Sequence, residues 1–134
     1  MAKIGDIEGV GESYAAKLKD AGVSTVEALL EQGATGKGRA ALAESTGISE
    51  KLILKWVNHA DLFRINGVAG QYAELLEAAG VDTVPELAQR NAENLAAKMA
   101  EVNDAKNLTN AVPSATTVAK WVVEAKTLER KISH

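Results

Sequence analysis

The sequence predicts an all-α fold that consists of two copies of one unit, with eight or nine short helices in total. Three observations indicate this fold. Apolar residues recur at spacings of three and four, as they do on one face of a helix. No segment shows the alternating Val, Ile, Thr and aromatic residues of a half-buried strand. Finally, two long segments of the chain resemble each other, which indicates an internal repeat.

The repeat is visible when the chain is shifted by 58 residues, because residues 7–29 then align with residues 65–87. Further along, the offset becomes 65, and Lys55-Trp56-Val57 matches Lys120-Trp121-Val122, so the second copy carries seven additional residues. The junction between the copies is too short and too apolar for a flexible linker. We therefore predict two units, residues 1–63 and 64–134, related by a pseudo-two-fold axis and packed as one compact body.

The first copy is predicted to contain four helices. Gly22 favours a left-handed cap at the end of the first helix, and Ser24 and Glu27 have the spacing of a capping box at the start of the second. The predicted helices cover residues 12–21, a short stretch that starts near Ser24 or Thr25, residues 37–45, and a stretch that follows Ser49 as N-cap and runs to residue 63.

The second copy is predicted to repeat these helices. Its second helix starts at Thr83 with Pro85 in the first turn, where the missing N–H of proline costs little. The third and fourth helices are expected over residues 92–102 and 114–130. Residues 103–113 between them hold the additional residues and are expected to be irregular.

Composition and charge exclude several classes of protein. The chain has 15 Lys+Arg, 18 Asp+Glu, a formal net charge of -3 and no Cys. Without Cys there are no disulfides, thiolate nucleophiles or thiolate metal sites. The mildly acidic balance opposes a dedicated, strongly basic nucleic-acid-binding domain. No apolar window is long enough to span a membrane, and residues 1–6 contain no signal-peptide run, so we expect a cytoplasmic protein.

One motif stands out, Ile7-x-Gly9-Val10-Gly11-x-x-x-Ala15-x-x-Leu18. It resembles the helix-hairpin-helix motif, in which two antiparallel helices meet at a tight glycine turn. The second copy departs from the pattern, because Ala69 replaces the second glycine and Gly70 follows it. Over roughly residues 3–130, the chain is similar to a small bacterial and archaeal family of tandem helix-hairpin-helix proteins classed as a domain of unknown function.

The resemblance implies a site for a DNA backbone phosphate at the helix that follows the turn, held by backbone amides without sequence readout. A second candidate for an anion site is the stretch 36–39, which combines two glycines with two cations at a predicted helix start. The alternative there is a glycine-rich turn with solvated charges. The candidate phosphate-contacting residues are Gly9, Val10, Gly11, Lys17, Lys37, Arg39, Gly67 and Gly70.

The charges around the first turn favour a purely structural interpretation of the motif, because acids outnumber bases there. The residues concerned are Lys3, Lys17 and Lys19 on one side and Asp6, Glu8, Glu12 and Asp20 on the other. Non-specific DNA affinity arises mainly from several Lys/Arg–phosphate contacts.

No residue pattern indicates an enzyme. His59 and His134 lack further ligands or nucleophiles at useful spacing, and no pair of carboxylates is set for acid–base chemistry. Trp56 and Trp121 are expected in the core. We therefore expect no catalytic residue, no metal and no cofactor.

Two functions remain open. The first is a non-enzymatic module that binds duplex or branched DNA weakly and without sequence specificity. The alternative is a protein-interaction or scaffold module that keeps the fold without binding DNA. Small residues on helical faces motivate the alternative: Ala40, Ala41, Ala43, Ala96, Ala97 and Ala100. We expect no membrane partner, and the sequence leaves the oligomeric state open.

Overall fold

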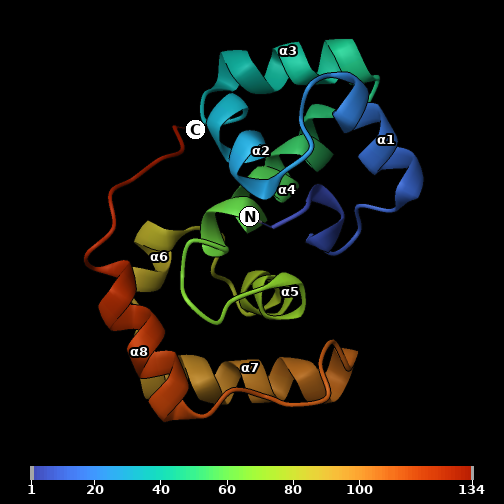
Figure 1. Cartoon of the computed structure of the whole chain (residues 1–134). Helices are drawn as coiled ribbons and strands as arrows, with labels where there is room; N and C mark the ends of the chain where they lie inside the picture. The colour runs from blue at the N-terminus through green and yellow to red at the C-terminus, as the bar shows by residue number, and fades with distance from the viewer. Residues whose placement is uncertain (1, 134) are drawn as a thin grey trace. The chain divides into compact units, whose positions relative to one another are not determined.

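The computed structural model describes residues 2–133 and confirms an all-α fold (Figure 1). In this part of the chain there are one 3-10 helix and eight α-helices; no strand is present, only an isolated bridge between Lys3 and Thr25. None of the described helices is long and apolar enough to cross a membrane. The elements are η1 (Ile4–Asp6), α1 (Glu12–Asp20), α2 (Val26–Gln32), α3 (Gly36–Thr46), α4 (Glu50–Leu62), α5 (Gly70–Ala78), α6 (Val84–Ala88), α7 (Ala92–Lys106) and α8 (Ala115–Ala125).

The chain divides into two compact units, and the division differs from the expected one at the C-terminal end. Unit 1 contains residues 2–61 and 131–133 of the described chain, and unit 2 contains residues 62–130. The sequence assigned the whole C-terminal end to the second copy. The last residues belong to unit 1 instead, because Ile132 is buried and the Ser133 N–H donates to the Ala34 carbonyl at 2.8 Å.

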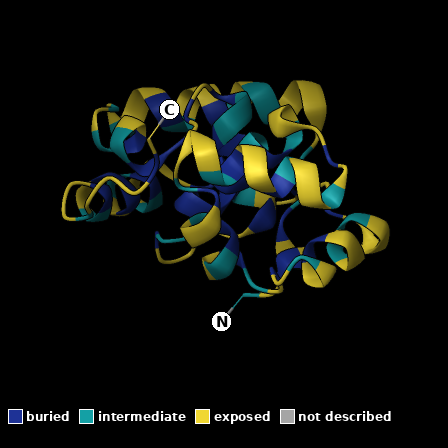
Figure 2. Cartoon of the chain, turned by 90° about the horizontal axis from the view of Figure 1, so that it is seen from above, coloured by how far each residue is buried: buried dark blue, intermediate teal, exposed yellow. Residues whose placement is uncertain are grey.

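Unit 1 is held together by the apolar sides of its helices. Helices α1 and α2 each contact both α3 and η1. Figure 2 shows that helices carry buried and exposed stripes, as amphipathic elements do. The buried apolar residues of unit 1 are Ile4, Ile7, Val10, Leu18, Val23, Val26, Leu29, Leu42, Ile48, Ile53, Trp56, Val57, Ala60 and Ile132.

Unit 2 is organised around α8, which packs against α6 and α7, while α5 packs against α7. Figure 1 shows α8 crossing α7 near one end of that helix. Residues that align with the core of unit 1 at the offsets of 58 and 65 are buried here as well. They include Ile65, Val68, Leu76, Val81, Val84, Leu87, Trp121, Val122 and Ala125.

Helices α1 and α5 end in the same way, at the glycines where the sequence placed the first helix end. Gly22 has φ +89°, its N–H donates to the Lys19 carbonyl, and the Val23 N–H donates to the Leu18 carbonyl. This is the Schellman motif, which satisfies carbonyls at a helix end and requires the left-handed conformation that glycine adopts readily. Gly80, with φ +97°, closes α5 with the equivalent bonds.

The start of α2 corrects one expectation. The N-cap is Thr25 rather than Ser24, because the Thr25 hydroxyl oxygen accepts a hydrogen bond from the Ala28 N–H at 3.0 Å. The predicted Ser24–Glu27 capping box is therefore wrong by one residue. Ser49 does cap α4, since its hydroxyl oxygen accepts from the Leu52 N–H at 3.2 Å.

The last two helices also differ from the expectation. Helix α7 continues to Lys106 instead of ending at residue 102, and Asn107, with φ +51°, caps it in the left-handed conformation. Helix α8 ends at Ala125 instead of residue 130. There the Thr127 hydroxyl donates to the Glu124 carbonyl at 2.7 Å, so a side chain satisfies a carbonyl of the last turn and the chain leaves the helix.

Candidate phosphate-binding site at the start of α1

The turn before α1 places a glycine against the core tryptophan of unit 1. Gly9 is exposed and has φ +91°, and a Cβ built on it lies 3.6 Å from Trp56 Nε1. Val10, only 6% exposed, is directed into the core, and its N–H donates to the Ile7 carbonyl. The turn is therefore anchored in the core by Val10, and Gly9 is a glycine because its backbone has positive φ.

Gly11 is different, because nothing in the fold requires a glycine there. It is the N-cap of α1 with an ordinary extended backbone (φ -79°), and a Cβ built on it meets nothing within 4 Å. No side chain caps the N-terminus of α1. In contrast, the hydroxyls of Thr25, Thr35 and Ser49 cap α2, α3 and α4. At the start of α1, the N-cap residue therefore provides no side-chain hydrogen bond to the first backbone amides of the helix.

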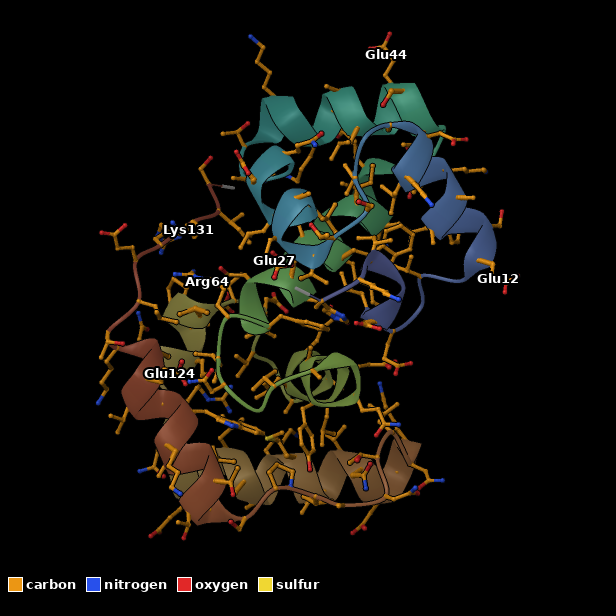
Figure 3. All side chains as sticks on the ribbon, in the orientation of Figure 1. Glu12, Glu27, Glu44, Arg64, Glu124 and Lys131 are labelled. Carbon is orange, nitrogen blue, oxygen red and sulfur yellow. The ribbon has the colours of Figure 1, made fainter. Side chains whose placement is uncertain are left out.

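No side chain caps α5 in unit 2 either, but the turn before it differs from the turn before α1. Ala69 is the N-cap of α5, and Gly70 is buried as the first helical residue, so Gly70 is less accessible to a phosphate than the exposed Gly11. Gly67 is exposed with φ +89°, but the neighbouring Asn66 N–H donates to Glu124 Oε1 at 3.0 Å. Glu124 comes from α8 (Figure 3). This turn therefore already holds an anion, a carboxylate of its own unit.

The charges near the start of α1 have both signs. Lys17 is exposed, and its ammonium lies 5.8 Å from the centroid of the Tyr14 ring. Glu12 is the first residue of α1, is exposed, and points away from the helix into solvent (Figure 3). A carboxylate at this position is favourable for the helix dipole and repels an approaching phosphate.

At the second candidate site, the start of α3, a side chain of the protein already binds a backbone amide. The Thr35 hydroxyl oxygen accepts from the Gly38 N–H at 3.0 Å, which caps the helix. A Cβ on Gly38 comes within 2.0 Å of the Gln32 carbonyl oxygen, so this glycine is required by close packing. Lys37 is exposed and keeps a free approach to solvent.

Arg39, the other cation of this candidate, lies in the interior of unit 1. It is 7% exposed, and its guanidinium donates to the Gly33 carbonyl and to the Ser133 carbonyl, both at 2.8 Å. Both terminal nitrogens of the guanidinium therefore hold carbonyls of unit 1, and little of the side chain is accessible to an external phosphate. Arg39 is therefore a structural residue that fastens the C-terminal segment to unit 1.

The two tryptophans lie in the core, as expected. Trp56 is 1% exposed and Trp121 is 3% exposed. Tyr14 contacts Trp56 edge-on with ring centroids 5.1 Å apart, and Tyr72 lies against Trp121 at 5.4 Å. His59 is buried on α4. Among the described residues, no group of three or more His, Cys, Asp or Glu side chains is arranged to hold a metal ion.

Two contacts were not predicted from the sequence: the one between Glu124 and Asn66, and the one between Arg39 and Ser133. The Glu124 contact could have been suspected, because the residue that aligns with Glu124 at the offset of 65 is His59, so the copies differ in charge there. No local sequence pattern indicates the hydrogen bond from Arg39 to Ser133, because the two residues are 94 positions apart.

The chain was also compared with known proteins. No curated protein and no solved structure matches it significantly. Residues 8–128, which include the turn, α1 and both tryptophans, match the family described as Domain of unknown function (DUF4332). That match spans most of the sequence, and the chain therefore belongs to the DUF4332 family.

Proposed function

We propose that the chain is a non-enzymatic module of two helix-hairpin-helix units that binds DNA weakly, with the start of α1 holding one backbone phosphate. Backbone amides at a helix N-terminus suit a phosphate oxygen, and such contacts fix position without reading base sequence. Only the first unit makes this contact. In the second unit, the Glu124 carboxylate accepts from the Asn66 N–H of the corresponding turn and repels a phosphate that approaches there.

The proposal depends on one observation: the N-cap of α1 is Gly11, and no side chain caps this helix. The preferred residues at an N-cap are Ser, Thr, Asp and Asn, which the chain uses for α2, α3, α4, α7 and α8. At α1 it has a glycine that neither conformation nor packing requires. A missing side chain at this position leaves room for an outside group to reach the amides. Lys17 on α1 is exposed and can assist at this site. Lys37, also exposed, lies at the start of α3, so it can contact only a further phosphate of the same duplex.

The test separates binding from folding. In Gly11→Ser, the new hydroxyl can cap α1, so the free energy of unfolding should stay equal or rise by about 0.5 kcal/mol. The same hydroxyl occupies the amides, so affinity for a fluorescent duplex, measured by anisotropy at low salt, should fall about tenfold. Ala69→Ser is the matched control, because it adds the same cap to α5 and should leave DNA affinity unchanged. Equal affinity of Gly11→Ser and the wild type would contradict the proposal, as would salt-independent binding.

The second candidate function is a protein-interaction module, and an exposed apolar residue favours it. Val123 on α8 is 63% exposed and lies in an open surface depression of about 550 Å³ with Thr116 and Ala119. Light scattering of the wild type and of Val123→Lys tests this function. A larger particle that reverts to a monomer in Val123→Lys supports it; two identical monomers count against self-association.

A further inference from the structure

A separate pocket lies on unit 1 along another part of α1. It is open to solvent, with a volume of about 870 Å³, in the size range of small-ligand sites. Its wall comes from η1, from the middle and end of α1, and from the segment before α2. The lining residues are Lys3, Ile4, Gly5, Asp6, Ala15, Ala16, Lys19, Ser24 and Thr25.

The polar groups of this pocket are mainly unused donors. Within the described residues, the exposed ammonium groups of Lys3 and Lys19 make no hydrogen bond or ion pair. The Ser24 hydroxyl makes no hydrogen bond within the described part of the chain either. The Thr25 hydroxyl oxygen accepts from Ala28, and its proton has no acceptor among those residues, so it can donate outward.

The one acid in the pocket is engaged with the backbone, because Asp6 Oδ2 accepts from the Lys3 N–H at 3.0 Å. Besides Lys19, the α1 side of the pocket is lined by the small residues Ala15 and Ala16. Lys3, Lys19, Ser24 and Thr25 line the same open space, and their ammonium and hydroxyl donors match an acceptor-rich anion. A phosphate group offers several acceptor oxygens to such donors.

We propose that this pocket binds a phosphate group through Lys3, Lys19, Ser24 and Thr25. The site is distinct from the start of α1, because Ala15 lies one helical turn beyond Gly11 and Lys19 lies a further turn on. The phosphate is either part of a nucleic-acid strand or part of a free phosphorylated molecule. The pocket stands independently of the function proposed above, which rests on Gly11.

The experiment is a titration of the ¹⁵N-labelled chain with inorganic pyrophosphate, followed by amide chemical shifts. Saturable shifts should concentrate on residues 3–6, 15–19 and 24–25. The double variant Lys3→Gln/Lys19→Gln should bind about tenfold more weakly or worse, because two charged hydrogen-bond donors are lost. Lys98→Gln/Lys106→Gln is the control: it has the same net charge and removes two exposed lysines of α7. Absence of saturable shifts, or an equal loss in the control, overturns the proposal.

A second pair of variants adds a charge instead of removing one. Ala16→Glu puts a carboxylate into the pocket at an exposed helical position, and Ala97→Glu puts one on the exposed face of α7. Only Ala16→Glu should weaken pyrophosphate binding; equal binding in both overturns the proposal.

Measuring the duplex affinity of the Lys3→Gln/Lys19→Gln variant distinguishes the two possible sources of the phosphate. Duplex affinity reduced relative to the control assigns the pocket to a nucleic-acid strand, whereas unchanged duplex affinity with lost pyrophosphate binding assigns it to a free phosphorylated molecule. Gly11→Ser reports on the start of α1 alone, so failure of one site is distinguishable from failure of the other.

Discussion

At the level of single residues, the turn before α1 contains glycines of two kinds. Gly9 has φ +91° and faces Trp56, whereas Gly11 has an ordinary backbone and open space around it. The first is glycine because the backbone requires it. The fold does not require a glycine at the second position, which is why the proposed site rests on it.

The corresponding prediction compares two alanine substitutions. Gly9→Ala should lower the free energy of unfolding by about 1–2 kcal/mol, because a Cβ is strained at positive φ. Gly11→Ala should change it by less than about 0.5 kcal/mol, since the new methyl group meets nothing. Urea denaturation followed by tryptophan fluorescence measures both values, and equal losses would refute the distinction. Gly67→Ala should behave like Gly9→Ala, because its φ is +89° and it faces Trp121.

Arg39 and Lys37 are two residues apart but should respond in opposite ways. Arg39→Ala leaves the Gly33 and Ser133 carbonyls without their charged donor and should cost about 2–4 kcal/mol of stability. Lys37→Gln removes an exposed charge and should leave stability within about 0.5 kcal/mol while weakening duplex binding. Denaturation and anisotropy on the same samples check this. A stable Arg39→Ala that has lost more DNA affinity than Lys37→Gln would return Arg39 to the binding surface.

At the level of elements, the connection from α7 to α8 depends on one side chain. Asn103 Oδ1 accepts from the N–H groups of Leu108 and Thr109 at 2.8 and 2.9 Å, and its Nδ2 donates to the Thr109 carbonyl. The segment expected to be irregular is thus partly helical, and its remaining loop is fastened to the helix that precedes it.

Asn103→Ala should therefore cost about 1–3 kcal/mol, because two amides and a carbonyl lose their partner. Asn103→Asp keeps an acceptor for both amides and should cost less. Hydrogen exchange at the amides of Leu108 and Thr109 should speed up in Asn103→Ala and change little in Asn107→Gly, a control that keeps the left-handed cap of α7. Unchanged exchange in Asn103→Ala would show that the loop is held by other contacts.

The same scale shows how far the sequence predicts the fold and the site. The helices could be placed because local signals mark them, such as Gly22 after α1 and Ser114 before α8. The helix ends were predicted wrongly where a side-chain contact or a contact distant in sequence determines them. In residues 126–133, for example, the Thr127 hydroxyl bonds to the last turn of α8, and Ile132 is buried. Within the site, the turn was visible in the glycine pattern. The burial of Arg39 was not, because its partner is distant in sequence.

At the level of the whole molecule, charge limits what a DNA site on this chain can achieve. The formal net charge is -3, which disfavours binding that depends on many phosphate contacts at once. A site that uses backbone amides and a few lysines releases few counterions. Each lysine–phosphate contact contributes about -0.9 to the slope of log K against log[salt], so a slope of about -1 to -4 is expected. A slope near -8 would correspond to about nine lysine–phosphate contacts, many more than the proposed site supplies, and would contradict it.

A substitution of Glu12 tests whether charge close to the start of α1 limits DNA binding. Glu12 is an exposed acid at the first residue of α1, directly beside the proposed phosphate. Glu12→Gln should raise duplex affinity at low salt by about two- to fivefold, which corresponds to the roughly 0.3–1 kcal/mol of a charge near a helix end. The gain should shrink as salt rises, because the Debye length falls from about 30 Å at 0.01 M to about 10 Å at 0.1 M. Glu93→Gln is the matched control, since Glu93 is an exposed acid in the first turn of α7 and its removal changes the net charge equally. If both variants gain the same affinity, total charge governs binding and the start of α1 has no special part in it; a gain confined to Glu12→Gln places the phosphate at the start of α1.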